Sequence, residues 1–196
     1  MPPLFCHEDC KKLSDTADKA QVKHYNSLSI FLHWLMFVLI SLAFVLALLL
    51  DVLPKDIKPY WVNVHFVIGT LVLGLLAVRL LWRLVVGVPD LPSDMHPHSR
   101  KATHVVHGLL YVFMALIPIV GVLTAFYRGR GIDFGFYALP SPFEVDRATG
   151  RFFKEIHEVT AWTLFVLAGG HAVMALIHHY VLKDGILLRM LPFKKD

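Results

Sequence analysis

Four long stretches of the sequence contain no Asp, Glu, Lys or Arg, and they constrain the fold more than any other feature. They run over residues 24–50, 59–78, 102–127 and 159–182, with lengths of 27, 20, 26 and 24 residues. About 20 helical residues cross the roughly 30 Å hydrocarbon core of a bilayer, and helices satisfy their own backbone groups in lipid. The sequence therefore predicts an all-α integral membrane protein, a four-transmembrane-helix bundle with helices at about 27–50, 60–86, 102–126 and 156–182.

The composition agrees with a membrane protein and argues against several other classes. Hydrophobic residues make up 56% of the chain and charged residues only 17%. The basic residues, which give a net charge of +4, lie between apolar stretches rather than in one stripe, and this argues against a nucleic-acid partner. Two cysteines are too few for a disulfide scaffold or a four-cysteine metal centre. Cys6 and Cys10 flank a His-Glu-Asp segment with some metal-binding capacity, but we favour reduced cytosolic thiols.

The distribution of Lys and Arg predicts the orientation of the chain. We expect one domain over residues 1–196, with a polar extension at 1–26 and no cleavable signal, because the apolar run that follows is too long for a signal core. The N-terminal segment, the second connection and the C-terminal tail carry 12 basic residues, and the other side carries 7. The positive-inside rule then places both termini in the cytoplasm.

Four of the 12 histidines lie at two depths of the predicted spans. His157 and His171 are 14 residues apart, which is about 21 Å along a helix and within roughly 40° of the same face. His65 lies at the outer depth on the second span, and His33 lies toward the inner depth on the first. A six-coordinate haem takes one imidazole on each side of its iron. We therefore predict two haems, an outer one held by His65 and His157 and an inner one held by His33 and His171.

Two other features of the sequence bear on the type of haem and on its contacts. No C-x-x-C-H motif is present in the sequence, so the haems should be of b type. Arg79 is 14 residues after His65 and should return to the same face at the inner depth, where it would meet a haem propionate. The alternative interpretation of Arg79 is an arginine that extends its charge to the cytoplasmic surface.

Short motifs occur in one order along the spans. They are Leu32-His33-Trp34, Val64-His65, Val78-Arg79-Leu80-Leu81-Trp82-Arg83, His104, Gly108, Pro118, Gly121, Tyr127-Arg128-Gly129, Ile156-His157-Glu158, His171-Ala172, His178-His179-Tyr180, Lys183-Asp184 and Leu187-Leu188-Arg189-Met190. Together they resemble the prokaryotic cytochrome b561 family over about residues 24–193, and most of all its four-helix members that oxidise superoxide and reduce ubiquinone.

The resemblance implies a location, a ligand set and a quinone site. It implies a multi-pass protein of the bacterial inner membrane and the same four axial histidines that the spacing predicts. It also implies that His107 and His178 contact ubiquinone at the cytoplasmic end. The alternative interpretation of this pair is two histidines at the membrane interface.

The leading functional hypothesis is electron transfer from periplasmic superoxide, which leaves as dioxygen, to ubiquinone. With both axial positions filled, the reaction would be outer-sphere, without a catalytic side chain at the iron. A basic entrance would raise the arrival rate of the superoxide anion, and we predict that Arg128, Arg130, Arg151 and Lys154 supply it. Arg147, Lys55 and Lys58 lie on the same side, and carboxylates in the same loops would dilute the field.

Two other functions stay open at this stage. The first is a haem-bearing, quinone-linked membrane anchor of another dehydrogenase or hydrogenase, which would bind a protein redox partner. The second is a transporter that uses its histidines for metal ions or protons, although the spans contain no central carboxylate to pair with them.

Overall fold

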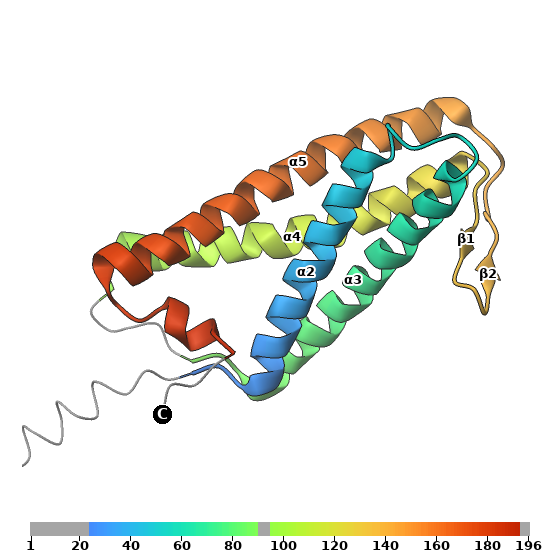
Figure 1. Cartoon of the computed structure of the whole chain (residues 1–196). Coiled ribbons are helices and arrows are strands. Elements are labelled where there is room, and N and C mark those ends of the chain that lie inside the picture. Colours follow the sequence, from blue (N-terminus) through green and yellow to red (C-terminus); the bar gives the residue numbers. More distant parts are fainter. Residues whose placement is uncertain (1–23, 90–94, 193–196) are drawn as a thin grey trace, which may run out of the picture.

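The computed structural model describes residues 24–89 and 95–192, and four long helices make up most of this part of the chain (Figure 1). They are α2 (Ser27–Leu49), α3 (Lys58–Val86), α4 (Pro97–Tyr127) and α5 (Arg147–Ile177). All four are long and apolar enough to cross a membrane. The predicted four-helix membrane fold is confirmed, while Cys6, Cys10 and most of the N-terminal extension lie outside the described residues.

Local sequence signals set the ends of the helices. The side chain of Asn26 accepts a hydrogen bond from Leu28 N at 2.9 Å and caps the start of α2. Pro59 and Pro97 stand in the first turns of α3 and α4, where a proline costs no helical hydrogen bond. Gly87 ends α3 with a φ of +77°, a conformation that glycine adopts without strain.

Two helices begin earlier than the sequence predicts. α4 starts at Pro97 rather than at about residue 102, and α5 starts at Arg147 rather than at about residue 156. The prediction placed these starts near the edges of the uncharged stretches, whereas both helices continue into charged residues. Charge limits the part of a helix that lies in lipid, but it does not stop the helix from continuing into water.

The two ends of the bundle are closed by different structures. At one end, here called the hairpin end, β1 (Ile132–Asp133) pairs antiparallel with β2 (Ala138–Leu139) between α4 and α5. Asn63 of α3 holds this hairpin through two hydrogen bonds to the backbone of Asp133, at 2.7 and 2.9 Å. The opposite end, here called the terminal end, contains the start of α2, the π-helical turn η1 (His178–Leu182) and the 3₁₀ turn η2 (Leu187–Met190) (Figure 1).

The helices pack as neighbours and expose apolar side chains outward. The closest packing joins α4 with α5, then α2 with α3, and α3 with α4. Met36, Val72 and Leu76 form a small buried cluster between α2 and α3. By contrast, Leu84 and Val85 are 82% and 81% exposed. An apolar outer surface of this kind belongs in the acyl chains of a bilayer, so the protein is embedded in a membrane.

Candidate functional site

The outer pair of histidines lies near the hairpin end, between α3 and α5. The ring centroids of His65 and His157 are 6.0 Å apart, and the ring planes are inclined at 78°. His65 Nδ1 donates a hydrogen bond to Ala43 O at 3.1 Å, and His157 Nδ1 donates one to Ile117 O at 2.9 Å. A carbonyl oxygen can only accept, so both rings carry their proton on Nδ1. Each Nε2 is left with the lone pair that a metal ion requires.

A glycine of α4 makes room for the outer pair. A Cβ atom at Gly121 would lie 3.0 Å from His157 Cε1 and 3.1 Å from His157 Nδ1. These distances are tighter than most real contacts of a Cβ atom, so any larger residue would push the imidazole away. The close approach of α4 to the ring also allows the hydrogen bond to Ile117.

The inner pair lies toward the terminal end, between α2 and α5. The ring centroids of His33 and His171 are 6.5 Å apart at an angle of 78°. His107 of α4 lies nearer to His171, with a centroid distance of 5.0 Å, and its Nδ1 donates to Thr103 O at 2.7 Å. His171 therefore has an imidazole on two sides.

Both predicted pairs have the separation that a shared iron requires. A metal–imidazole bond of about 2 Å, with about 1 Å more from nitrogen to ring centre, places two rings across one ion about 6 Å apart. The centroid distances of 6.0 and 6.5 Å agree with this separation. The 5.0 Å between His107 and His171 is too short for it. The residues present thus fit two bis-histidine haems with the pairing that the sequence predicts.

Donors without acceptors lie on α3 beside the inner level. Arg79 Nη1 and Trp82 Nε1 are buried, and neither has a hydrogen-bond partner within the described residues. Arg79 Nε and Arg83 Nη1 both donate to the hydroxyl of Tyr111, at 3.5 and 3.3 Å. A buried donor without an acceptor is costly, and the carboxylate of a haem propionate is the acceptor that a guanidinium favours. This arrangement agrees with the role predicted for Arg79 and adds Trp82 as a second free donor.

The predicted steering residues line one cavity at the hairpin end. Its volume is about 400 Å³, and its lining residues are Arg128, Arg130, Arg147, Arg151 and Lys154. Gly150 of α5 allows the end of α4 to approach closely here, because a Cβ atom at this position would lie 2.7 Å from Arg128 Cγ.

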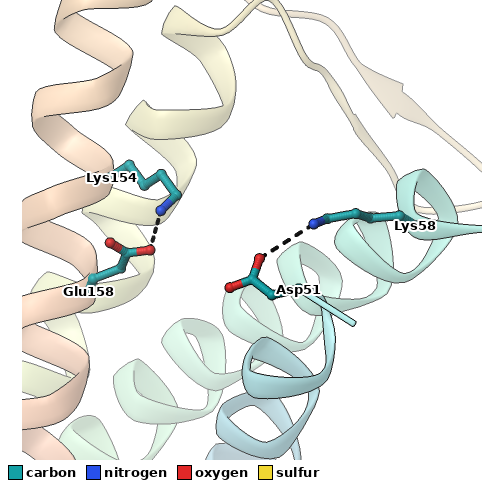
Figure 2. A network of polar contacts seen from close by, with 4 residues as sticks. All are labelled: Asp51, Lys58, Lys154 and Glu158. Carbon is teal, nitrogen blue, oxygen red and sulfur yellow. Dashed lines mark hydrogen bonds and ion pairs between the residues drawn. The ribbon is translucent and has the colours of Figure 1, made fainter. Parts of the chain in front are cut away.

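Carboxylates balance only some of the positive charge at this end. Lys154 pairs with Glu158 one turn further along α5, and Lys58 pairs with Asp51 at 3.4 Å (Figure 2). Lys58 and the exposed Lys55 do not belong to the cavity lining. The charge that faces the cavity is therefore mainly that of the arginines.

His178, which the resemblance assigns to the quinone site, lies in the π-helical turn beyond α5. Its Nδ1 donates a hydrogen bond to the carboxylate of Asp184. His178 and His107 thus have different surroundings, since His107 is bonded to the backbone of its own helix.

The family model described as prokaryotic cytochrome b561 matches residues 24–193, which is most of the chain. The chain belongs to the prokaryotic cytochrome b561 family. Membership makes it a bacterial membrane protein of electron transfer, of the oxidoreductase type, with haem of b type.

Individual members of the cytochrome b561 family are similar over nearly their full length. A Yersinia pestis protein named probable superoxide oxidase CybB is 32% identical over 174 residues, 88% of this chain and 98% of the relative. Cytochrome b561 homolog 1 of Escherichia coli is 29% identical over 89% of this chain and all of the relative. Cytochrome b562 of Cereibacter sphaeroides is 32% identical over 85% of this chain and 94% of the relative.

Three contributors to this b561 site were not assigned a role from the sequence. Gly121 contacts His157, Tyr111 holds Arg79 and Arg83, and Asp184 pairs with His178. Gly121 has no Cβ atom, but a glycine in a membrane helix is only a weak signal for such an approach. The other two contacts depend on how separate segments pack, so spacing along one helix does not predict them.

Proposed function

We propose that this chain takes electrons from superoxide at the hairpin end and delivers them to ubiquinone at the terminal end, through two haems of b type. In this proposal His65 and His157 would hold the outer haem, and His33 and His171 would hold the inner haem. The observation that carries the proposal is the presence of two imidazole pairs at two levels of one bundle, with centroid distances of 6.0 and 6.5 Å.

Histidines, an arginine and a tryptophan have separate roles in the proposed haem sites. Haem held by these imidazoles would supply single-electron exchange. His65 and His157 are held in the required tautomer by Ala43 and Ile117, which orients their Nε2 atoms for ligation. Arg79 and Trp82 supply donors to an inner propionate.

The basic cavity supports superoxide as the electron donor. Superoxide is a small anion, and the cavity is lined by cationic side chains of α5 and of the loop after α4. Lys154 belongs to this lining and lies three residues before His157 on α5, so the cavity lining comes within about one helical turn of the outer pair. The similarity to a protein named probable superoxide oxidase supports the same donor.

The terminal end supports the quinone site and the cytoplasmic orientation. His107 contacts His171, so it lies beside the inner pair, where a group on its Nε2 would be close to the electron source. In the proposed role Nε2 of His107 and of His178 hydrogen-bonds a quinone oxygen, accepting from a hydroxyl group of ubiquinol, or donating to a carbonyl oxygen of ubiquinone when the ring is protonated on both nitrogens. The excess of Lys and Arg at this end supports a cytoplasmic location of both termini in the inner membrane. A fluorescent protein fused to the C-terminus, which folds only in the cytoplasm, should then fluoresce, and a dark but expressed fusion would contradict this orientation.

Rapid mixing of superoxide with the purified, oxidised protein in detergent tests the proposed function. The reduced α bands of haem should develop within the mixing experiment, and added ubiquinone should then be converted to ubiquinol. Replacing Arg128 and Arg151 together by glutamine should slow haem reduction about 10-fold, within the range that steering provides, and salt should slow the wild-type protein in the same way.

The matched control is Lys58→Gln, which removes a positive charge at the same end but outside the cavity lining. It should reduce at the wild-type rate. Haem that stays oxidised in the presence of superoxide would contradict the proposal. A dehydrogenase or hydrogenase that co-purifies and reduces the haem would then favour the anchor function.

A further inference from the structure

A carboxylate–imidazole pair lies at the terminal end of the chain, outside both proposed haem sites. His178 Nδ1 donates to Asp184 Oδ2, and the two side chains are 14% and 24% exposed. The other carboxylate oxygen of Asp184 accepts a hydrogen bond from Ile186 N at 3.1 Å. Asp184 is thus anchored to the backbone on one side and directed at the imidazole on the other.

The backbone between these two residues departs from regular helix in a way that brings them together. In an α-helix, residues six apart lie about 9 Å along the axis and roughly 120° apart around it. Here α5 changes into the π-helical turn His178–Leu182, and Lys183 then adopts a left-handed φ of 53°. A π-helical turn is rare, and a left-handed φ is unfavourable for a residue other than glycine. Both features occur most often at functional sites. The effect of both is that the chain folds Asp184 back onto His178.

We propose that Asp184 is a positioning residue for quinone reduction, which acts through His178. Its carboxylate keeps a proton of His178 on Nδ1 and fixes the plane of the ring, so that a second proton, taken up on Nε2, is directed at a carbonyl oxygen of the quinone. The inference rests on the proposed function, in which a quinone binds at the terminal end. It adds a carboxylate to that site, together with a route by which protons enter from water.

The overall reaction and the proton step balance. Two superoxide ions, one ubiquinone and two protons give two dioxygen molecules and one ubiquinol. In the step at His178, the Nε2–H bond of the protonated ring breaks and an O–H bond forms on the reduced quinone oxygen. The electron pair of the broken bond stays on Nε2, while Nδ1–H stays bonded to Asp184. Water at the partly exposed edge of the pair then returns a proton to the ring, whose transient positive charge the carboxylate stabilises.

The substitution Asp184→Asn tests this role because it keeps the shape and an acceptor oxygen but removes the charge. The kcat of ubiquinone reduction should fall about 10- to 100-fold, with KM changed less than about twofold. The solvent deuterium isotope effect on kcat should rise, because proton delivery becomes slower. Haem content and the rate of haem reduction by superoxide should stay at wild-type values. The matched control is Asp51→Asn, an exposed carboxylate at the opposite end of the bundle, which should leave kcat unchanged (Figure 2).

Two further variants separate positioning from a purely structural role. Asp184→Glu keeps the charge and should recover part of kcat. In the double variant with His178→Asn, the added Asp184→Asn should cause no further loss beyond that of His178→Asn alone. An asparagine variant with wild-type kcat, a glutamate variant as slow as asparagine, or additive losses in the double variant would overturn the inference.

Failure of the proposed function would give a different result from failure of the role of Asp184. If superoxide does not reduce the wild-type protein, the proposed donor is wrong, and the pair is tested in reverse by ubiquinol-driven haem reduction, which Asp184→Asn should slow equally. A wild-type protein that exchanges electrons with neither ubiquinone nor ubiquinol would overturn both.

Discussion

Individual residues of the bundle show how little space surrounds the outer histidine pair. His157 is fixed from two directions, by the carbonyl of Ile117 and by the backbone of α4 at Gly121. The glycine is required here for its lack of a Cβ atom rather than for its backbone freedom. The position of the His157 ring is therefore determined by a neighbouring helix as much as by α5.

Gly121→Ala should displace the His157 ring and weaken the outer haem site. A Cβ atom would lie 3.0 Å from the ring, and the helix backbone cannot yield as a flexible side chain would. We expect the haem content to fall toward half of the wild-type value, measured by the pyridine haemochrome assay. Gly108→Ala is the control, because no atom lies within 4 Å of a Cβ atom at that position of the same helix. Equal haem content in the two variants would contradict this account.

Arg79 offers a test at the inner level. If its guanidinium meets a haem propionate, Arg79→Gln removes a positive charge beside one haem and should lower the reduction potential of that haem alone by tens of millivolts. Redox titration followed by absorbance measures both potentials. Lys101→Gln, at an exposed position of the same end, should leave both potentials unchanged. Unchanged potentials in Arg79→Gln would favour the alternative of an arginine that only extends to the membrane surface.

At the scale of the helices, the N-terminal cap of α5 stabilises a segment that also lines the basic cavity. Asp146 caps the helix by accepting hydrogen bonds from Ala148 N and Thr149 N, at 2.9 and 3.2 Å. The Thr149 hydroxyl also donates to it, and these bonds hold the pKa of Asp146 below its ordinary value of 3.8. The first turns of this helix carry Arg147 and Arg151 of the cavity, so the cap also orders the proposed superoxide entrance.

Asp146→Ala should lower the Tm and slow haem reduction by superoxide, whereas Asp146→Asn should preserve both at neutral pH, because asparagine also caps helices. Since folding lowers the pKa of Asp146, the ionised cap stabilises the protein above pH 3.8, and this contribution is lost as the pH falls below that value. The Tm of the wild-type protein should therefore decrease relative to that of Asp146→Asn in acid. Curves that stay parallel down to the acid limit would contradict the role of the cap.

The fold and the histidine pairs could be predicted from the sequence because they depend on properties of single helices. Charge-free stretches mark membrane spans, and a spacing of 14 residues places two histidines on one face of α5. The positions of Tyr111 and Asp184 depend on contacts between segments and on a π-helical turn, which spacing does not encode. That His107 lies closer to His171 than His33 does could not be predicted from spacing, because three helices determine that geometry.

At the scale of the whole molecule, the proposed electron path crosses the membrane from the hairpin end to the terminal end. The basic cavity lies at the hairpin end, the two imidazole pairs lie along the bundle, and the His178–Asp184 pair lies at the terminal end. Each part is built mainly on a different pair of segments, yet α5 contributes to the cavity and to both histidine pairs and leads directly into the turn that carries His178. The path therefore depends on the two pairs of histidines, without which the ends of the molecule are not connected.

The most direct test of this central claim is the haem content per chain of the wild-type protein and of four variants, His33→Ala, His65→Ala, His157→Ala and His171→Ala. We expect about two haems in the wild-type protein and about one in each variant. Variants of the outer pair and variants of the inner pair should lose spectroscopically different haems. A wild-type protein with a single haem, or any of the four variants with full haem content, would contradict the central claim.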